Sequence, residues 1–371
     1  MREGFRWGLL GAGQVARNFG RSVTLLPGHK VAAVASRGAA RAKATATELG
    51  SIRNLNSYAA LAADPDIDAI YVSTPAALHR EHVALALEAG KPVLCEKPFT
   101  VTADEARELA ALAERHGTFC MEAMWMRFIP AIRALKERIV AGEIGEVRML
   151  QAELGFSVPY EPESQYYDIE MGCGALLELG IYPLSLAYYV LGRPEAGQIL
   201  TGNAPNGLDA RATITLRFPS GTLASLSCGF DQRLRNRAIV IGTNGSFELD
   251  APLYAPERLA LTKSPQPASK ALEAQQGGLL DRLSNTSAML TRLRRRHAPL
   301  LRQLVRRERS TRSYPFLGFG YQFEAAEVAR CVLAGLREST VMPLAESVEI
   351  MECLERLRTD GCFADGNETG Y

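Results

Sequence analysis

The feature that most constrains the fold is a glycine motif near the start of the chain, Gly11-Ala12-Gly13-Gln14-Val15-Ala16. An apolar segment, 5–10, precedes it, and a helical segment, 17–26, follows it. The first glycine permits a tight turn, the second lets a pyrophosphate approach, and the small third residue lets helix and strand pack closely. The sequence therefore predicts a dinucleotide-binding domain with cofactor contacts at Gly11, Gly13, Gln14 and Val15. The alternative is a glycine-rich turn in an unrelated α/β domain.

Strand-like and helical patterns alternate through residues 1–122, which we assign to this Rossmann domain. Further strands are expected at 30–35, 52–55, 68–73 and 92–95, and helices at 39–49, 58–63, 78–89. Such alternation predicts a parallel, doubly wound sheet whose ligands bind at the carboxyl ends of the strands. The chain as a whole is therefore predicted to be an α/β protein.

The second strand ends in Ser36-Arg37, where an NAD-specific site usually carries an acid. A hydroxyl and a guanidinium suit the 2′-phosphate of NADP, because arginine binds phosphate bidentately. We therefore predict NADP as the cofactor, with NAD possible. The alternative is that Arg37 is a solvated loop residue.

Two later strands are also followed by residues that could contact a cofactor or take part in catalysis. Thr74 and Pro75 follow one strand, and Glu96-Lys97-Pro98 follows the next. These residues are predicted to border the cofactor, although a surface Lys-Pro turn is the alternative for Lys97. His79, which starts the following helix, is a candidate nicotinamide contact or else a cap or surface residue.

The composition limits location and partners. The formal net charge is +1, and the seven cysteines are scattered without a CxxC pair. We expect reduced thiols in the cytoplasm, no metal site, and no nucleic-acid partner. No apolar run approaches the length of a bilayer span, and the start of the chain resembles no secretory signal, so no membrane partner is expected.

Residues 123–371 are predicted to form a second α/β domain. Its strands, expected at 147–156, 197–203, 210–218, 222–230, 236–242 and 245–249, form a mostly antiparallel open sheet. A helix over 175–190 places Glu178 and Tyr182 on one face. One face of the sheet is expected to be covered and the other open and apolar, so we predict a homodimer or homotetramer joined through this sheet.

Residues 265–315 differ from the rest of this domain. Arginines and leucines gather between 282 and 312, which predicts a basic amphipathic helical insertion. It would pack on its own domain or on a partner subunit; binding to acidic lipid or nucleic acid is the alternative. The closing helices, 320–336 and 344–358, are expected to pack on the second domain.

Several motifs together resemble the glucose–fructose oxidoreductase / inositol dehydrogenase (Gfo/Idh/MocA) family. They are Gly11–Ala16, Ser73-Thr74-Pro75 with His79, Glu96-Lys97-Pro98 and Gly172–Tyr182. The resemblance implies an NAD(P)-dependent oxidoreductase of sugars, cyclitols or diols, with Lys97 as the catalytic lysine and Glu96 orienting it or the nicotinamide ribose. Cys173 and Glu178 depart from the family pattern, in which glycine and aspartate are common.

Within the family, Glu122–Phe128 and Tyr182 resemble the branch of dimeric dihydrodiol dehydrogenases and NADP-dependent D-xylose dehydrogenases. The branch implies that Trp125 and Phe156 form an apolar wall and that Arg127 positions a substrate or carboxamide oxygen. Tyr182 would exchange a proton with substrate, and Lys97 would lower the pKa of Tyr182. Glu178 would contact the substrate or orient Lys97.

Other functions remain open at this level. The chain could be a sugar ketoreductase of a biosynthetic pathway or a glycosidase that uses bound NAD as a transient redox centre. It could also be a non-catalytic NADP-binding regulator, or a scaffold that acts through the arginine-rich insertion.

Arg37 provides a direct test of cofactor choice. Arg37→Ala should weaken NADPH binding far more than NADH binding, because NADPH alone carries the 2′-phosphate. Fluorescence titration with each reduced cofactor measures both affinities, and equal losses would contradict the assignment.

Overall fold

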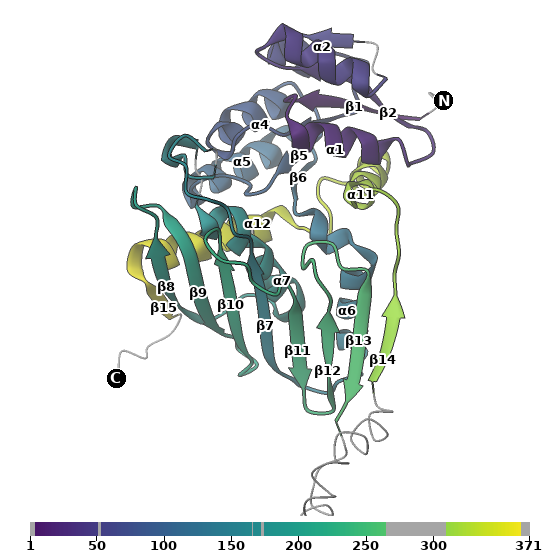
Figure 1. Cartoon of the computed structure of the whole chain (residues 1–371). Coiled ribbons are helices and arrows are strands. Elements are labelled where there is room, and N and C mark those ends of the chain that lie inside the picture. The colour runs from purple at the N-terminus through teal and green to yellow at the C-terminus, as the bar shows by residue number, and fades with distance from the viewer. Residues whose placement is uncertain (1–3, 51–52, 165, 172–173, 265–308, 365–371) are drawn as a thin grey trace, which may run out of the picture.

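The computed structural model describes residues 4–50, 53–164, 166–171, 174–264 and 309–364. Two sheets organise these residues, one of six strands and one of nine. Figure 1 shows the smaller sheet with its helices above the larger, open sheet. The predicted α/β class with a Rossmann sheet and a second, mostly antiparallel sheet is confirmed.

The six-stranded sheet has the order β3-β2-β1-β4-β5-β6, and every pair in it is parallel. Its chain order reverses between β1 and β4, which is where dinucleotides bind in such sheets. The strands are β1 (Phe5–Leu10), β2 (His29–Ala35), β3 (Arg53–Leu55), β4 (Ala69–Val72), β5 (Val93–Glu96) and β6 (Cys120–Ala123). The helices are α1 (Gln14–Val23), α2 (Ala39–Glu48), α3 (Tyr58–Ala62), α4 (His79–Glu88) and α5 (Ala103–His116).

The nine-stranded sheet has the order β14-β13-β12-β11-β7-β10-β9-β8-β15. Only the β7–β10 pair is parallel. Helices α6 (Pro130–Val140) and α7 (Ile181–Leu191) contact one face of this sheet. The strands are β7 (Val147–Gly155), β8 (Ala196–Asn203), β9 (Asp209–Arg217), β10 (Leu223–Gly229), β11 (Ala238–Gly242), β12 (Gly245–Leu249), β13 (Arg258–Lys263), β14 (Arg309–Ser313) and β15 (Cys362–Ala364).

Strand β9 shows why only one face of this sheet is covered. Ala212, Ile214 and Leu216 are buried, and full burial of the isoleucine and leucine side chains contributes about 1.5–3 kcal/mol each. Between them, Thr213 and Thr215 are exposed on the opposite face. Along β9 the free face is therefore polar, and the idea of an open apolar face is wrong for this strand.

The edge strand β14 and its neighbour β13 were not predicted. Arg309–Ser313 falls within the segment expected to be helical, but it pairs with β13 as a fully exposed antiparallel strand. Local arginine content and the leucine stripe suggested a helix there, whereas pairing with β13 satisfies the backbone as a strand. The remainder of the predicted insertion, 265–308, lies outside the described residues.

The closing helices return the chain to the first domain. Helix α11 (Tyr321–Leu333) packs against α1, and α12 (Leu344–Asp360) packs against α5 and β6 as well as α7. The prediction that both helices pack on the second domain is therefore incomplete, because each also packs on the first; within the second domain, α11 contacts the 3₁₀ turn Trp125–Phe128. Helical periodicity shows that a face is buried, but it does not show what that face packs against.

The segment Ile169–Leu191 is long and apolar enough, by composition, to cross a membrane, contrary to the sequence expectation. Yet 78% of its most apolar window is buried inside the protein. It includes a π-helical turn, Leu176–Gly180, which leads directly into α7. The apolar residues of the π-helical turn and of α7 mostly pack in the interior against β7 and β10, whereas Ile169 and Met171 are exposed.

Gly320, immediately before α11, gives a test of how closely the start of α11 packs against Ile129 and Trp125. It has φ +103°, and a Cβ there would lie 2.6 Å from Ile129 Cδ1 and 3.1 Å from a Trp125 ring carbon. Gly320→Ala should cost roughly 2–5 kcal/mol of unfolding free energy, from backbone strain plus overpacking. Gly335 has φ +68° with no atom within 4 Å of its Cβ, so Gly335→Ala should cost only about 1–2 kcal/mol. Urea unfolding measures both, and equal losses would contradict the packing argument.

Candidate active site

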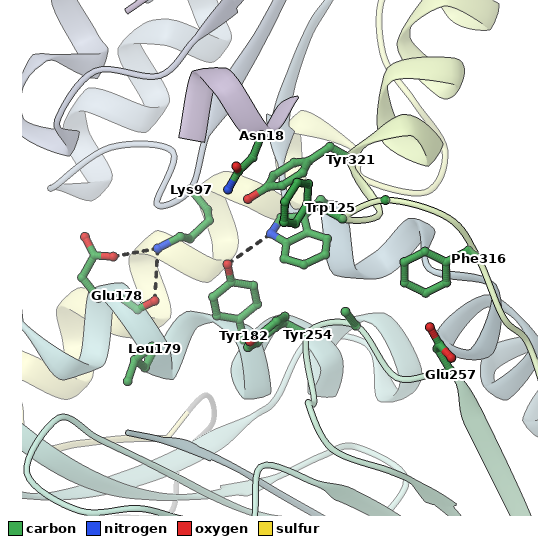
Figure 2. Close-up of a pocket in the computed structure, with 13 residues that line it drawn as sticks. Asn18, Lys97, Trp125, Glu178, Leu179, Tyr182, Tyr254, Glu257, Phe316 and Tyr321 are labelled. Atoms are coloured by element: carbon green, nitrogen blue, oxygen red, sulfur yellow. Dashed lines mark hydrogen bonds and ion pairs between the residues drawn. The ribbon is translucent and has the colours of Figure 1, made fainter. Parts of the chain in front are cut away.

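A cavity of about 490 Å³ lies between the two domains. Figure 2 shows its lining residues around an elongated space, with Lys97 at one end and Glu257 at the other. Segments far apart in the chain contribute to it. The lining residues are Asn18, Lys97, Trp125, Glu178, Leu179, Tyr182, Tyr254, Ala255, Glu257, Phe316, Gly318, Phe319 and Tyr321.

Lys97 enters the cavity from the carboxyl end of β5, and the peptide bond to Pro98 is cis. Its Nζ donates to Glu178 Oε2 at 2.8 Å and to the Glu178 backbone carbonyl at 3.1 Å. Glu178 lies in the π-helical turn, a form that occurs frequently at functional sites. Burial by itself would lower the pKa of Lys97, but the Glu178 carboxylate and Tyr182 raise it overall. Lys97 is therefore a cation at neutral pH.

Tyr182, in the first turn of α7, faces the same space. The Trp125 indole N–H donates to its Oη at 3.2 Å, and Lys97 Nζ lies 5.5 Å from its ring centroid. Burial raises the pKa of Tyr182 to about 12, although Lys97 and the Trp125 hydrogen bond act in the opposite direction. The expected effect of Lys97 is present, but burial outweighs it. Tyr182 is therefore protonated at neutral pH.

Glu96 lies behind Lys97, outside the cavity lining. Its carboxylate accepts hydrogen bonds from the Tyr71 hydroxyl and, at 3.2 Å, from the Lys97 backbone N–H. Burial raises the pKa of Glu96 to about 7, against the lowering effects of Tyr71 and Lys97. Of the two roles predicted for Glu96, this geometry matches orientation of Lys97.

His79 is neither a surface residue nor part of the cavity lining. It is 1% exposed, and its ring nitrogens lie 2.8 Å from the Thr74 carbonyl and 2.9 Å from the Pro98 carbonyl. Burial lowers the pKa of His79 although these carbonyls favour protonation. The residue therefore joins the loop after β4, which includes exposed Pro75, to the Lys97–Pro98 turn.

The start of α1 fits a dinucleotide pyrophosphate. Gly13 precedes the helix without a side-chain cap, so first-turn N–H groups are available to an anion. A Cβ at Gly13 would meet nothing within 4 Å, whereas one at Gly11, with φ +120°, would lie 2.7 Å from Ser73 Oγ. Val15, two residues after Gly13, is 38% exposed. In the described part of the chain, no group of three or more His, Cys, Asp or Glu side chains could hold a metal.

At the end of β2, Ser36 and Arg37 differ in exposure. Ser36 is buried, and its Oγ accepts a hydrogen bond from the Gly38 N–H at 3.4 Å. Arg37 is exposed beyond the strand. The guanidinium is thus accessible at the position where a Rossmann site reads the adenosine ribose.

Two predicted substrate residues lie elsewhere. Arg127 is fully buried, donates to Ser185 Oγ at 2.7 Å and pairs with Glu346. The prediction that it positions a substrate oxygen is wrong, because its guanidinium is used to hold α7 and α12 together. Phe156 does not line the cavity; its ring centroid lies 6.3 Å from that of Tyr254, which does.

Several lining residues were not identified from the sequence. Asn18 lies one turn after Gln14, whose Nε2 donates to Asn18 Oδ1 at 2.9 Å, and that i, i+4 spacing was a usable signal. Tyr321 stacks on Trp125 at 4.7 Å between centroids. Tyr254, Glu257 and Phe316 lie on loops, where no periodic pattern indicates their direction.

Comparisons with known proteins agree with this geometry. Residues 5–124 match the family model "Oxidoreductase family, NAD-binding Rossmann fold", and residues 132–248 match the "GFO/IDH/MocA C-terminal domain". The chain is 34% identical over 365 residues to the mouse (Mus musculus) trans-1,2-dihydrobenzene-1,2-diol dehydrogenase, covering 95% of this chain and 96% of that protein. The bovine (Bos taurus) enzyme of the same name is 33% identical over 361 residues, with the same coverage.

Solved structures show the same fold at lower identity. A 3-ketoreductase from Actinomadura kijaniata, in complex with NADP and TDP-benzene, has a TM-score of 0.76 at 23% identity, covering 96% of this chain and 97% of that one. An aldose-aldose oxidoreductase from Caulobacter crescentus, complexed with glycerol, has a TM-score of 0.78 at 21% identity, covering 97% and 99%.

The buried carboxyl of Glu96 predicts a pH effect on stability. Its folded pKa of about 7 lies above the ordinary 4.5, so the folded state binds this proton more tightly. The stability that it contributes is full below about pH 4.5 and is lost as the pH rises through 7. As the pH rises from 4.5 to 8, the unfolding free energy of Glu96→Gln should therefore increase by roughly 2–4 kcal/mol relative to that of the parent. Urea unfolding across this range, with exposed Glu114→Gln as control, measures the gain; a pH-independent difference would contradict it.

Proposed function

Because this chain belongs to the Gfo/Idh/MocA oxidoreductase family, we propose that it transfers a hydride between NADP and a carbinol or carbonyl carbon of a sugar, polyol or cyclic trans-diol. The protein is an NAD(P)-dependent oxidoreductase. The observation that carries the substrate proposal is the convergence of Lys97 and Tyr182 on one cavity at the edge of the nucleotide sheet.

Lys97 and Tyr182 have different roles at the substrate oxygen, charge stabilisation and proton transfer. When bound, the nicotinamide ring supplies the chemistry of hydride exchange. The Lys97 ammonium binds the substrate oxygen and stabilises negative charge on it. Tyr182, protonated at neutral pH, donates its proton to a carbonyl oxygen during reduction and takes it back during oxidation. The Trp125 N–H stabilises the phenolate that forms in between.

The substrate class rests on the relatives and on the cavity walls. Relatives at 31–34% identity are named as dihydrodiol dehydrogenases. Trp125, Tyr254 and Tyr321 line the cavity with aromatic rings, which suit a flat ring. A D-xylose dehydrogenase activity and a sugar ketoreductase activity fit the same Lys–Tyr pair. A glycosidase would form product without net change in NADPH, and a regulator would bind NADPH without turnover.

We further propose three properties of the working enzyme. NADP is preferred over NAD, on the exposed Arg37 at the end of β2. The location is cytoplasmic, on the scattered cysteines. The protein is a homodimer or homotetramer joined through the nine-stranded sheet, on the family resemblance, and the interface includes the polar free face of β9. Sedimentation that gives a monomer at micromolar concentration would refute this assembly.

Substitution of the two central residues tests the function. With a panel of aldoses, ketosugars, inositols and dihydrodiols plus NADP, the parent should form reduced nicotinamide, followed by absorbance. Lys97→Met and Tyr182→Phe should each lower kcat by roughly 10²–10⁴, because each removes a group that acts on the substrate oxygen. NADPH affinity should change little in either variant.

Exposed Tyr160→Phe is the matched control for loss of a phenol hydroxyl. Unchanged turnover in Lys97→Met with NADPH binding intact would rule out the mechanism. Failure of every compound in the panel would rule out the proposed substrate class.

A further inference from the structure

The cavity lining carries more negative than positive charge. Its described lining residues include one cation, Lys97, and two carboxylates, Glu178 and Glu257, so the net charge is +1 − 2 = −1. The Lys97 ammonium is already bound to Glu178 at 2.8 Å. Among the described residues, no second lining cation is left to balance an anionic group on a substrate.

Glu257 occupies the end of the cavity remote from the reacting groups. It precedes β13, is exposed, and lies beside Phe316, away from Lys97 (Figure 2). Its backbone carbonyl accepts a hydrogen bond from the Tyr314 N–H at 2.7 Å, which fixes the main chain there. Its carboxylate has no hydrogen-bond or ion-pair partner in the described part of the chain. The acceptor atoms are therefore available to a ligand.

Aromatic rings connect the two ends. Trp125 stacks on Tyr321 at 4.7 Å and lies 5.5 Å from Tyr254, and Phe316 and Phe319 continue the lining toward Glu257. Such faces bind the apolar side of a ring and attract cations rather than anions. A substrate whose reacting carbinol lies at Lys97 would thus direct its far end toward a carboxylate.

We propose that Glu257 forms a distal subsite that selects neutral or cationic substrates carrying a hydroxyl or ammonium group remote from the reacting carbon. This inference rests on the proposed function, because it locates the reacting carbon at Lys97 and Tyr182. The Glu257 carboxylate accepts hydrogen bonds from the remote donor. A carboxylate or phosphate at that position meets like charge and no compensating cation in the described lining. Sugar acids and sugar phosphates are therefore poor substrates.

Matched ligands test the subsite. Glucose, glucosamine, glucuronate and glucose 6-phosphate are compared as substrates by kcat/KM, and as ligands of the NADPH-loaded full-length protein by calorimetry. The parent should favour the first two over the anions. Glu257→Gln should reduce this preference about 2- to 5-fold, as expected for one partly exposed charge, and Glu257→Lys should reduce it further. Added salt should weaken the discrimination in the parent.

Glu114→Gln, exposed on α5, is the control and should leave the preference unchanged. Equal affinity for neutral and anionic ligands in the parent, or an unchanged preference in both Glu257 variants, would overturn the proposal. If no ligand is oxidised, the proposed function fails by that measurement. The calorimetric ranking of ligands still decides whether Glu257 selects by charge.

Discussion

The ion pair between Lys97 and Glu178 is the interaction on which the site depends. Lys97 directly follows β5 of the nucleotide sheet, and Glu178 belongs to the π-helical turn of the second domain. Two hydrogen bonds from one ammonium thus join domains whose residues are 81 positions apart. The pair keeps the lysine charged despite burial, and it holds the cavity at the edge where the cofactor binds.

Two buried polar side chains, Glu96 and His79, support that pair from behind, and both have hydrogen-bond partners. Glu96 accepts from Tyr71 and from the Lys97 backbone, and His79 bridges two carbonyls of adjacent loops. An unpaired buried polar group costs about 1–3 kcal/mol, so these contacts define one arrangement of the Lys97 turn. Arg127 likewise joins α7 to α12, through Ser185 and Glu346. The active site is therefore positioned by polar contacts within the core as well as by apolar packing.

Local patterns predicted most elements correctly, because the strands and helices here carry their own periodicity. The glycine motif, the strand ends at Thr74 and Lys97, and the helix that presents Tyr182 were all evident in the sequence. Arg127 was misassigned because the branch resemblance implied a contact with substrate, whereas its guanidinium is buried against Ser185 and Glu346. The loop residues of the cavity carried no periodic signal.

The sequence by itself determined the nucleotide fold and the family, because both depend on residue types at short, fixed spacings. It also marked Lys97 and Tyr182 as candidates, each through its own local motif, and the tertiary structure brought them to one cavity. Only the tertiary structure decided that α11 packs on α1, that burial keeps Tyr182 protonated, and that Glu257 lies opposite Lys97. Burial and charge at a site are sums over neighbours from distant segments. Those neighbours are set by how the two sheets close on each other, and the strand end at Lys97 becomes a site only through that closure.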